Sequence, residues 1–356
     1  MRLIVTQKVK RVCLPRDFAA GFRLDIATEI NSGTDLSTAT KIRSFRNTDV
    51  PSICDVWNAH HAASGVHCPM DALRLEWFAL AKPYFDAHNF LLCENEVGEI
   101  DGFLHFGHVS NSDQSNLHAS KLGIWAFCVR PHGNEDRVGS ELLKTFMELA
   151  TQQKSEQIVF RPVLPDSAFY LSIGPADAMV SVLSQEVRVC KWLAKVGFRP
   201  TVPTCMWELE LLEYKPPIDR MQIQIRRTAT VNQQLEEPSL PWWQACVLGH
   251  TAPTAYHLIH RTQNRLICDA LFWSLSPELQ SQQSQVVWLW PLKENEEPQQ
   301  QDFLTFLLAE SLRQYQEARI DLARTATAAD EQANTHILRK LGFRPSENGM
   351  IFELTL

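Results

Sequence analysis

The chain has 356 residues, 45% of them hydrophobic and 21% charged, which is typical of a globular protein with two domains. Its net charge of −7 argues against general nucleic-acid binding, and no apolar run has the length of a membrane span. The start mixes charges into its apolar stretch, and the nine cysteines contain no CxxC pair, which is typical of reduced thiols. We therefore expect a cytoplasmic protein with no nucleic-acid and no membrane partner.

Residues 1–40 show no clear period, and we expect an N-terminal extension there, either disordered or an upstream addition to the translated start. From residue 41 onward the hydrophobic pattern predicts alternating strands and helices. These are a strand at 41–46, a helix carrying Ile53, Val56 and Trp57, a helix near 70–80, strands at 90–94, 100–109 and 123–129, a helix from about Val138, a strand at 157–162, a helix stopping at Gly197, and a strand at 206–212.

The stretch from Gly123 to Leu149 organises this half of the chain. A buried strand ends at Val129, and a polar turn that contains Gly133 follows. The next helix has a small first turn with Gly139 and Ser140. A strand that leads through such a turn into a helix start offers backbone N–H groups and a positive dipole end, which bind phosphates. An ordinary strand-to-helix connection fits the same spacing.

A second set of elements follows a proline-containing linker at 214–220. Its pattern predicts a strand at 223–226, a hairpin of 254–260 with 266–274, a strand at 286–290, a helix at 302–313, a strand at 318–323 and a helix at 328–341 that ends at Gly342. One segment repeats: AKVGFRP at 194–200 returns as RKLGFRP at 339–345, and a strand follows each time. The repeat predicts two copies of one α/β domain.

The element order β-α-α-β-β-β-α-β-α-β resembles that of the GNAT acyltransferase superfamily, and the tandem layout resembles two-domain GNAT proteins such as mycothiol synthase. The resemblance implies an α/β fold of two tandem GNAT-like domains, each a mixed central sheet flanked by helices. The first would span 41–213 and the second, degenerate one 221–356. It also implies acyl transfer from acetyl-CoA to an amine, with a small molecule or a peptide as the acceptor.

The family's phosphate-binding signature is only partly kept. Its Arg or Gln falls on Asn134, its central glycine on Arg137 and its last glycine on Gly139. The resemblance implies that acetyl-CoA contacts Cys128, Val129, Gly133, Asn134, Arg137, Val138, Gly139 and Ser140. A turn too degenerate to bind a nucleotide is the alternative. The corresponding turn of the second copy, 291–298, has no glycine and three glutamates, so we expect that copy to have lost cofactor binding.

The usual catalytic positions of the family are not kept. The strand 123–129 has no carboxylate, and the positions of the family's tyrosine hold Leu193 and Leu338. We consider Tyr170 as the acid, and His105 or His108 as the base, against the alternative that all three are ordinary core or edge residues. His60, His61, His67 and Cys68 cluster in sequence, but their spacing fits no usual zinc site, and we predict no metal.

These features lead to an acyl-CoA-dependent N-acyltransferase in which the acceptor amine attacks the thioester directly. Two alternatives stay open at this point. A non-catalytic protein of GNAT fold that binds acyl-CoA, or acts as a scaffold, would explain the missing carboxylate and tyrosine. An interaction protein that binds no nucleotide would explain the acidic turn of the second copy.

Overall fold

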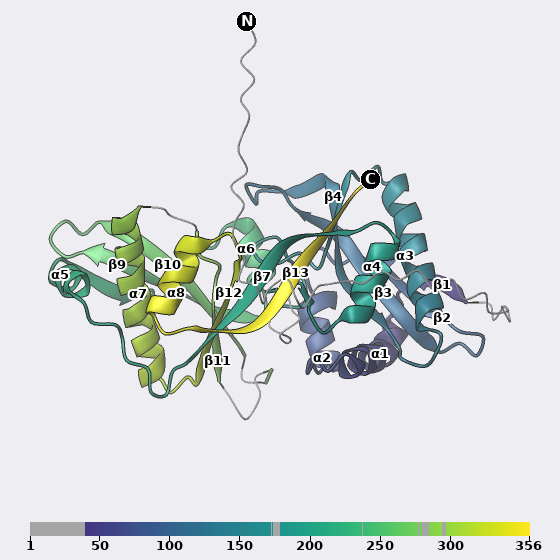
Figure 1. Cartoon of the computed structure of the whole chain (residues 1–356), viewed down its shortest axis with the longest axis horizontal. Coiled ribbons are helices and arrows are strands. Elements are labelled where there is room, and N and C mark those ends of the chain that lie inside the picture. The colour runs from purple at the N-terminus through teal and green to yellow at the C-terminus, as the bar shows by residue number, and fades with distance from the viewer. Residues whose placement is uncertain are drawn as a thin grey trace, which may run out of the picture. The chain divides into compact units, whose positions relative to one another are not determined.

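The computed structural model describes residues 40–171, 173, 179–236, 238–276, 278–279, 285–293 and 297–356, which lie in one compact unit, Thr38–Leu356 (Figure 1). The N-terminal extension expected at 1–40 falls, except for Thr40, outside the described residues. So do residues 294–296 of the acidic turn. Within the described part of the chain, no helix combines the length and the apolar character needed to cross a bilayer.

The first copy contains the predicted elements with shifted ends. They are β1 (Lys41–Ser44), α1 (Val50–Ala63), α2 (Ala72–Leu75), β2 (Phe90–Glu94), β3 (Ile100–Ser110), β4 (Leu117–Val129), α3 (Glu135–Gln152), β5 (Gln157–Phe160), β6 (Val182–Leu183), α4 (Val187–Lys195) and β7 (Arg199–Glu210). The helix expected near 70–80 continues from α2 as a π-helix, η2 (Glu76–Leu80). Two short 3₁₀ turns, η1 (Asn47–Asp49) and η3 (Ala87–Asn89), precede α1 and β2. The helix α3 begins three residues before the predicted start at Val138.

The second copy follows the linker. Its elements are α5 (Arg220–Thr228), β8 (Ala229–Gln233), α6 (Trp242–Leu248), β9 (Thr251–His260), β10 (Leu266–Leu275), β11 (Val286–Leu289), α7 (Pro298–Glu317), β12 (Leu322–Ala328), α8 (Gln332–Lys340) and β13 (Arg344–Thr355). The strand predicted at 223–226 is wrong, because this segment is the helix α5. The Asp219 side chain caps it by accepting a hydrogen bond from the Gln222 amide at 2.8 Å, and Gln222 and Ile225 share its buried face.

All strands join one sheet in the order β1-β2-β3-β4-β5-β13-β7-β12-β11-β10-β9-β8, with β6 attached to β13. The pairs β4–β5 and β11–β12 are parallel, and every other pair in this order is antiparallel. The predicted α/β class with two GNAT-like copies is confirmed by this arrangement and by the structural comparisons below.

The two copies exchange their last strands. The C-terminal strand β13 lies beside β5 of the first copy. The strand β7 lies beside β12 of the second copy (Figure 1). The strands β7 and β13 also pair with each other, and Arg199 faces Glu353 as Arg344 faces Glu208. These two pairs are equivalent positions of the repeat, so the junction is locally symmetric. The chain-order boundaries at 213 and 221 stay a prediction.

Helices cover both faces of the first copy's sheet. Neighbouring residues of a strand point to opposite faces. In β4, Phe127 packs edge-on against Trp192 of α4, whereas the Cys128 thiol faces His61 of α1. The helix α1 and the pair α3 and α4 therefore lie on opposite sides of β4. On the α1 side, the core is continuous with second-copy residues, among them Trp243, Val247 and Trp290.

Candidate functional site at the end of β4

The strands β4 and β5 part at the centre of the first copy. Their parallel register runs from Lys121 with Gln157 to Ile124 with Phe160, and the Arg161 amide makes the last link to the Ile124 carbonyl at 2.8 Å. The strand β4 continues to Val129 with β3 as its neighbour on the other side. The backbone of residues 126–129 thus continues past the last β4–β5 pairing; this break in the pairing, called the gap below, lies just before the turn that leads to α3.

The turn after β4 has the backbone conformation that we expect where a phosphate approaches the main chain closely. Gly133 has a φ of +93°, a value that favours glycine, and its amide donates to Glu135 Oε2 at 2.9 Å. Gly133 and Asn134 are exposed, and Arg137 is half-buried in the first turn of α3. The acidic residues of the helix start point toward α4: Glu135 lies 3.7 Å from Arg188, and Asp136 accepts from the Trp192 indole at 2.6 Å.

The rest of the predicted cofactor set is divided between core and surface. Cys128, Val129, Val138 and Gly139 are buried, whereas Ser140 is exposed. A Cβ atom on Gly139 would lie 3.2 Å from the Trp192 ring, so close packing of α3 on α4 explains this glycine. Burial raises the pKa of the Cys128 thiol well above 9, so it stays protonated and unreactive.

Buried polar side chains lie at the gap, and two of them, Arg161 and Glu186, are not indicated by the sequence. His60 Nδ1 is 3.2 Å from both the amide nitrogen and the carbonyl oxygen of Val129. Arg161, which follows β5, donates through Nη1 to both carboxylate oxygens of Glu186 at 2.7 Å. Burial lowers the pKa of His60 to about 4 and that of His61 well below 6.5, so both rings are neutral near pH 7.

The four residues weighed as a zinc site do not form one. His60 and His61 sit on α1 with Nε2 of the former and Nδ1 of the latter buried and without a hydrogen-bond partner. No group of three His, Cys, Asp or Glu side chains among the described residues is arranged to hold a metal ion.

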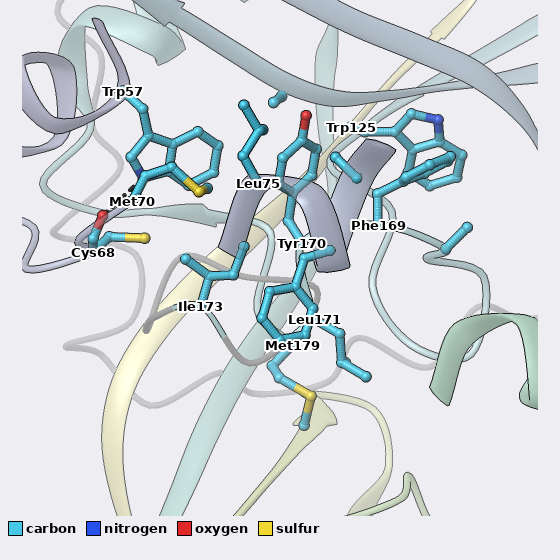
Figure 2. Close-up of a cluster of buried hydrophobic side chains, with 14 of the residues drawn as sticks. Trp57, Cys68, Met70, Leu75, Trp125, Phe169, Tyr170, Leu171, Ile173 and Met179 are labelled. Carbon is cyan, nitrogen blue, oxygen red and sulfur yellow. Dashed lines mark hydrogen bonds between the residues drawn. The ribbon is translucent and has the colours of Figure 1, made fainter. Parts of the chain in front are cut away.

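The two predicted catalytic residues contact each other. Tyr170 Oη and His105 Nδ1 are 2.9 Å apart, although the residues are 65 positions apart in sequence. Figure 2 shows the Tyr170 ring in a buried cluster between Trp57 and the Trp125–Phe169 pair. The ring stacks on Trp57 at 5.2 Å. His108, the other candidate base, instead bonds through Nδ1 to the His118 carbonyl at 3.0 Å.

Burial fixes the protonation of this pair. It lowers the pKa of His105 to about 3 and raises that of the Tyr170 phenol well above 10. Both groups are therefore neutral near pH 7. The His105 imidazole can accept or donate a hydrogen bond, and the Tyr170 phenol keeps its proton. Tyr170 also has a φ of +59°, and its amide donates to the Phe78 carbonyl at 2.9 Å. A left-handed backbone at a non-glycine residue needs such support.

Comparison with known proteins identifies the architecture. No family model and no curated protein sequence matches the chain. Among solved structures, the glucosamine N-acetyltransferase region of a fungal multi-domain GH3 β-N-acetylglucosaminidase superposes with a TM-score of 0.65 at 12% identity, over 89% of this chain and 38% of that one. A tandem GNAT protein from the clavulanic acid pathway gives 0.58 at 13% identity, over 89% and 98%. The chain has the GNAT fold.

A third neighbour is Saccharomyces cerevisiae N-myristoyltransferase, with a TM-score of 0.55 at 11% identity over 100% of this chain and 86% of that one. The predicted resemblance to tandem GNAT proteins is thus confirmed for the fold. The chain spans little more than a third of the fungal protein. The residues predicted to bind cofactor and to act in catalysis stay a prediction.

Proposed function

We propose that this chain is an acyl-CoA-dependent N-acyltransferase and that it binds acetyl-CoA in its first copy. The observation that carries the proposal is the end of the β4–β5 pairing at Ile124 and Phe160, after which β4 continues to Val129 and leads through a short turn into α3. An extended ligand with amide groups pairs with such a strand edge, and phosphates bind at helix N-termini. The names of the neighbours, which include acetyltransferases and an N-myristoyltransferase, support an acyl-CoA ligand.

The residues of this first copy suit an extended phosphate-bearing thioester. Cys128 and Val129 would lie along its amide-containing arm, and Gly133 and Asn134 would form the turn over the phosphates. Arg137 would place a cation in the first turn of α3, which Val138 completes, and Gly139 and Ser140 would follow in the second turn. The ion pair of Glu135 with Arg188 offsets part of the negative charge at this end.

Acyl transfer to an amine needs an acid that protonates the departing thiolate. When bound, acetyl-CoA supplies the activated acyl group, which an acceptor amine of a small molecule or a peptide attacks directly. Tyr170 is the candidate acid because its phenol carries a proton at neutral pH, although the burial that raises its pKa also makes it a weaker proton donor. His105 suits the orientation of this phenol through its 2.9 Å contact, whereas a base role would require its pKa to rise from about 3.

A second candidate function has its own support. A non-catalytic protein that binds acyl-CoA, or acts as a scaffold, is favoured by the side chains at the gap. His60 contacts both backbone polar groups of Val129, and the buried Arg161–Glu186 pair lies where β5 ends. Separating a buried ion pair is strongly destabilising. These contacts therefore oppose any movement of β4 and β5 that would admit an acceptor to the gap.

Calorimetric titration with acetyl-CoA tests the binding step. Ser140→Asp adds a negative charge to the second turn of α3, and Thr151→Asp adds the same charge to an exposed residue at its other end. Each hydroxyl bonds to the carbonyl four residues earlier, which makes the pair matched. We expect one-to-one binding that Ser140→Asp weakens at least about tenfold and Thr151→Asp leaves unchanged. No binding by the wild-type chain at millimolar acetyl-CoA would refute the proposal.

Turnover separates the two functions. Release of free CoA thiol is followed with a panel of small amines and peptide N-termini, and repeated turnover with any of them supports the enzyme. Binding without release across the panel would favour the non-catalytic alternative.

A further inference from the structure

We propose that the helix α6 of the second copy sets the position of Tyr170 in the first copy, through Lys82 and Trp243. The inference rests on the proposed function, because it assigns to the second copy a role in building the acyl-transfer site. Both residues would be positioning residues, since neither reaches the acyl group itself. Three sets of contacts carry the argument.

The first contact is a buried lysine that caps α6. Lys82 belongs to the first copy and is 4% exposed, yet its ammonium donates to the Val247 carbonyl at 2.7 Å, to Gly249 at 2.9 Å and to Cys246 at 3.4 Å. An ammonium has three donors, and the last carbonyls of a helix lack partners within it. The match satisfies both sides, and an ammonium suits the negative end of a helix dipole, while burial lowers the pKa of Lys82 to about 8.

The second contact connects this lysine to Tyr170 along the backbone. Lys82 lies two residues after the end of the π-helix η2, and its own amide bonds back to the Ala79 carbonyl. Within η2, the Phe78 carbonyl accepts the hydrogen bond from the Tyr170 amide at 2.9 Å. Because Tyr170 is held in a left-handed conformation, its backbone depends on this acceptor. A shift of η2 would therefore move the phenol relative to His105.

The third contact approaches Tyr170 from its other side. The indole of Trp243, a fully buried residue of α6, donates to the Pro165 carbonyl at 2.7 Å. Pro165 begins the segment that leads to Tyr170, and Ser167 in that segment bonds to the Phe169 carbonyl. The helix α6 thus contacts both the segment after η2 and the segment that leads to Tyr170. Stacking of Trp77 in η2 on His250 at 5.5 Å adds a further link between the copies.

The alternative is that Lys82 and Trp243 only hold the two copies together. Arg74→Met provides the matched control, because Arg74 is also a first-copy cation that donates to a second-copy carbonyl, that of Leu279 at 3.1 Å. Its side chain does not touch α6 in any contact described above. A role in general cohesion predicts similar effects for Lys82→Met and Arg74→Met, whereas positioning of Tyr170 predicts an effect of the first alone.

The test uses the full chain labelled with 3-fluorotyrosine and followed by ¹⁹F NMR, since the sequence has only five tyrosines. Tyr170→Phe assigns the Tyr170 resonance. We expect Lys82→Met and Trp243→Phe to shift or broaden this resonance, Lys82→Arg to restore most of it, and Arg74→Met to leave it in place. Trp243→Phe removes only the N–H donor and part of the ring, so it keeps the test usable if Lys82→Met does not fold.

Steady-state kinetics provide the second readout. We expect kcat to fall about tenfold or more in Lys82→Met, with KM for acetyl-CoA unchanged within twofold, because small displacements of a catalytic group are costly. An unmoved Tyr170 resonance in folded Lys82→Met or Trp243→Phe would overturn the inference, as would an equal shift in Arg74→Met. A wild-type chain without turnover would refute the proposed function, while the NMR result would still decide whether α6 positions Tyr170.

Discussion

The buried imidazole of His105 makes a specific prediction about acid stability. Its pKa is about 3 in the folded chain and 6.5 for an ordinary histidine. Between these values the unfolded chain binds more protons than the folded one, so stability rises with pH across this window and falls as the solution is acidified. At pH 5.0 protonation of this imidazole stabilises the unfolded chain by about 2 kcal/mol and the folded chain by almost nothing. His105 alone should therefore lower the free energy of unfolding by about 2 kcal/mol between pH 7.5 and pH 5.0.

Replacement of His105 by glutamine tests this magnitude. Glutamine does not titrate, yet it retains a polar group that can bond to the Tyr170 hydroxyl. Urea unfolding at pH 7.5 and 5.0 gives, for each protein, the loss of unfolding free energy between the two pH values. Comparing these losses removes any effect of the substitution that does not depend on pH. We expect the loss to be smaller by about 2 kcal/mol in His105→Gln. His88→Gln, at a side chain that is 89% exposed, should match the wild type. An equal loss in His105→Gln and wild type would show that His105 titrates normally.

Three further predictions follow from the gap, the exchanged strands and the phenol. Arg161→Met should lower the free energy of unfolding by about 3–5 kcal/mol, because it leaves the Glu186 carboxylate buried without its partner, and a double replacement with Glu186→Leu should recover part of the loss in urea titrations. The fragment 40–213 should aggregate in size-exclusion chromatography because it lacks β13, and co-expression with 214–356 should restore a soluble species. Tyr170→Phe should lower turnover at least about tenfold with acetyl-CoA affinity intact, and unchanged turnover would exclude Tyr170 from the mechanism.

The sequence predicts most elements of the fold but not which strands exchange partners. Element type follows from local hydrophobic period, and the repeat at 194–200 and 339–345 indicates two copies. The strands β7 and β13 are themselves copies, so their local sequences fit either neighbour equally well. Only the three-dimensional pairing of β13 with β5 reveals the exchange. The error at 223–226 has a similar origin, because four alternating residues fit a strand and a short helix alike.

The sequence singles out Tyr170 and His105 separately but does not predict that they touch, and their role in catalysis stays a prediction. Their contact depends on the left-handed backbone at Tyr170, which no local pattern predicts. The Arg161–Glu186 pair was missed because isolated charged residues near a strand end and a helix start usually face solvent. The position of Glu186 just before the apolar helix α4, where acidic residues are common, was the available signal.

The exchanged strands and α6 give the second copy a structural role, although we predict that it lacks a cofactor site. The second copy supplies β13 to the sheet that contains β4 and β5, and its loss would expose the edge of β5 at the proposed site. It also supplies α6, whose carbonyls satisfy the buried ammonium of Lys82 and whose Trp243 bonds to the Pro165 carbonyl. The two copies therefore act as one structural unit, in which the first would hold the acyl donor and the second would fix the shape of the site around it.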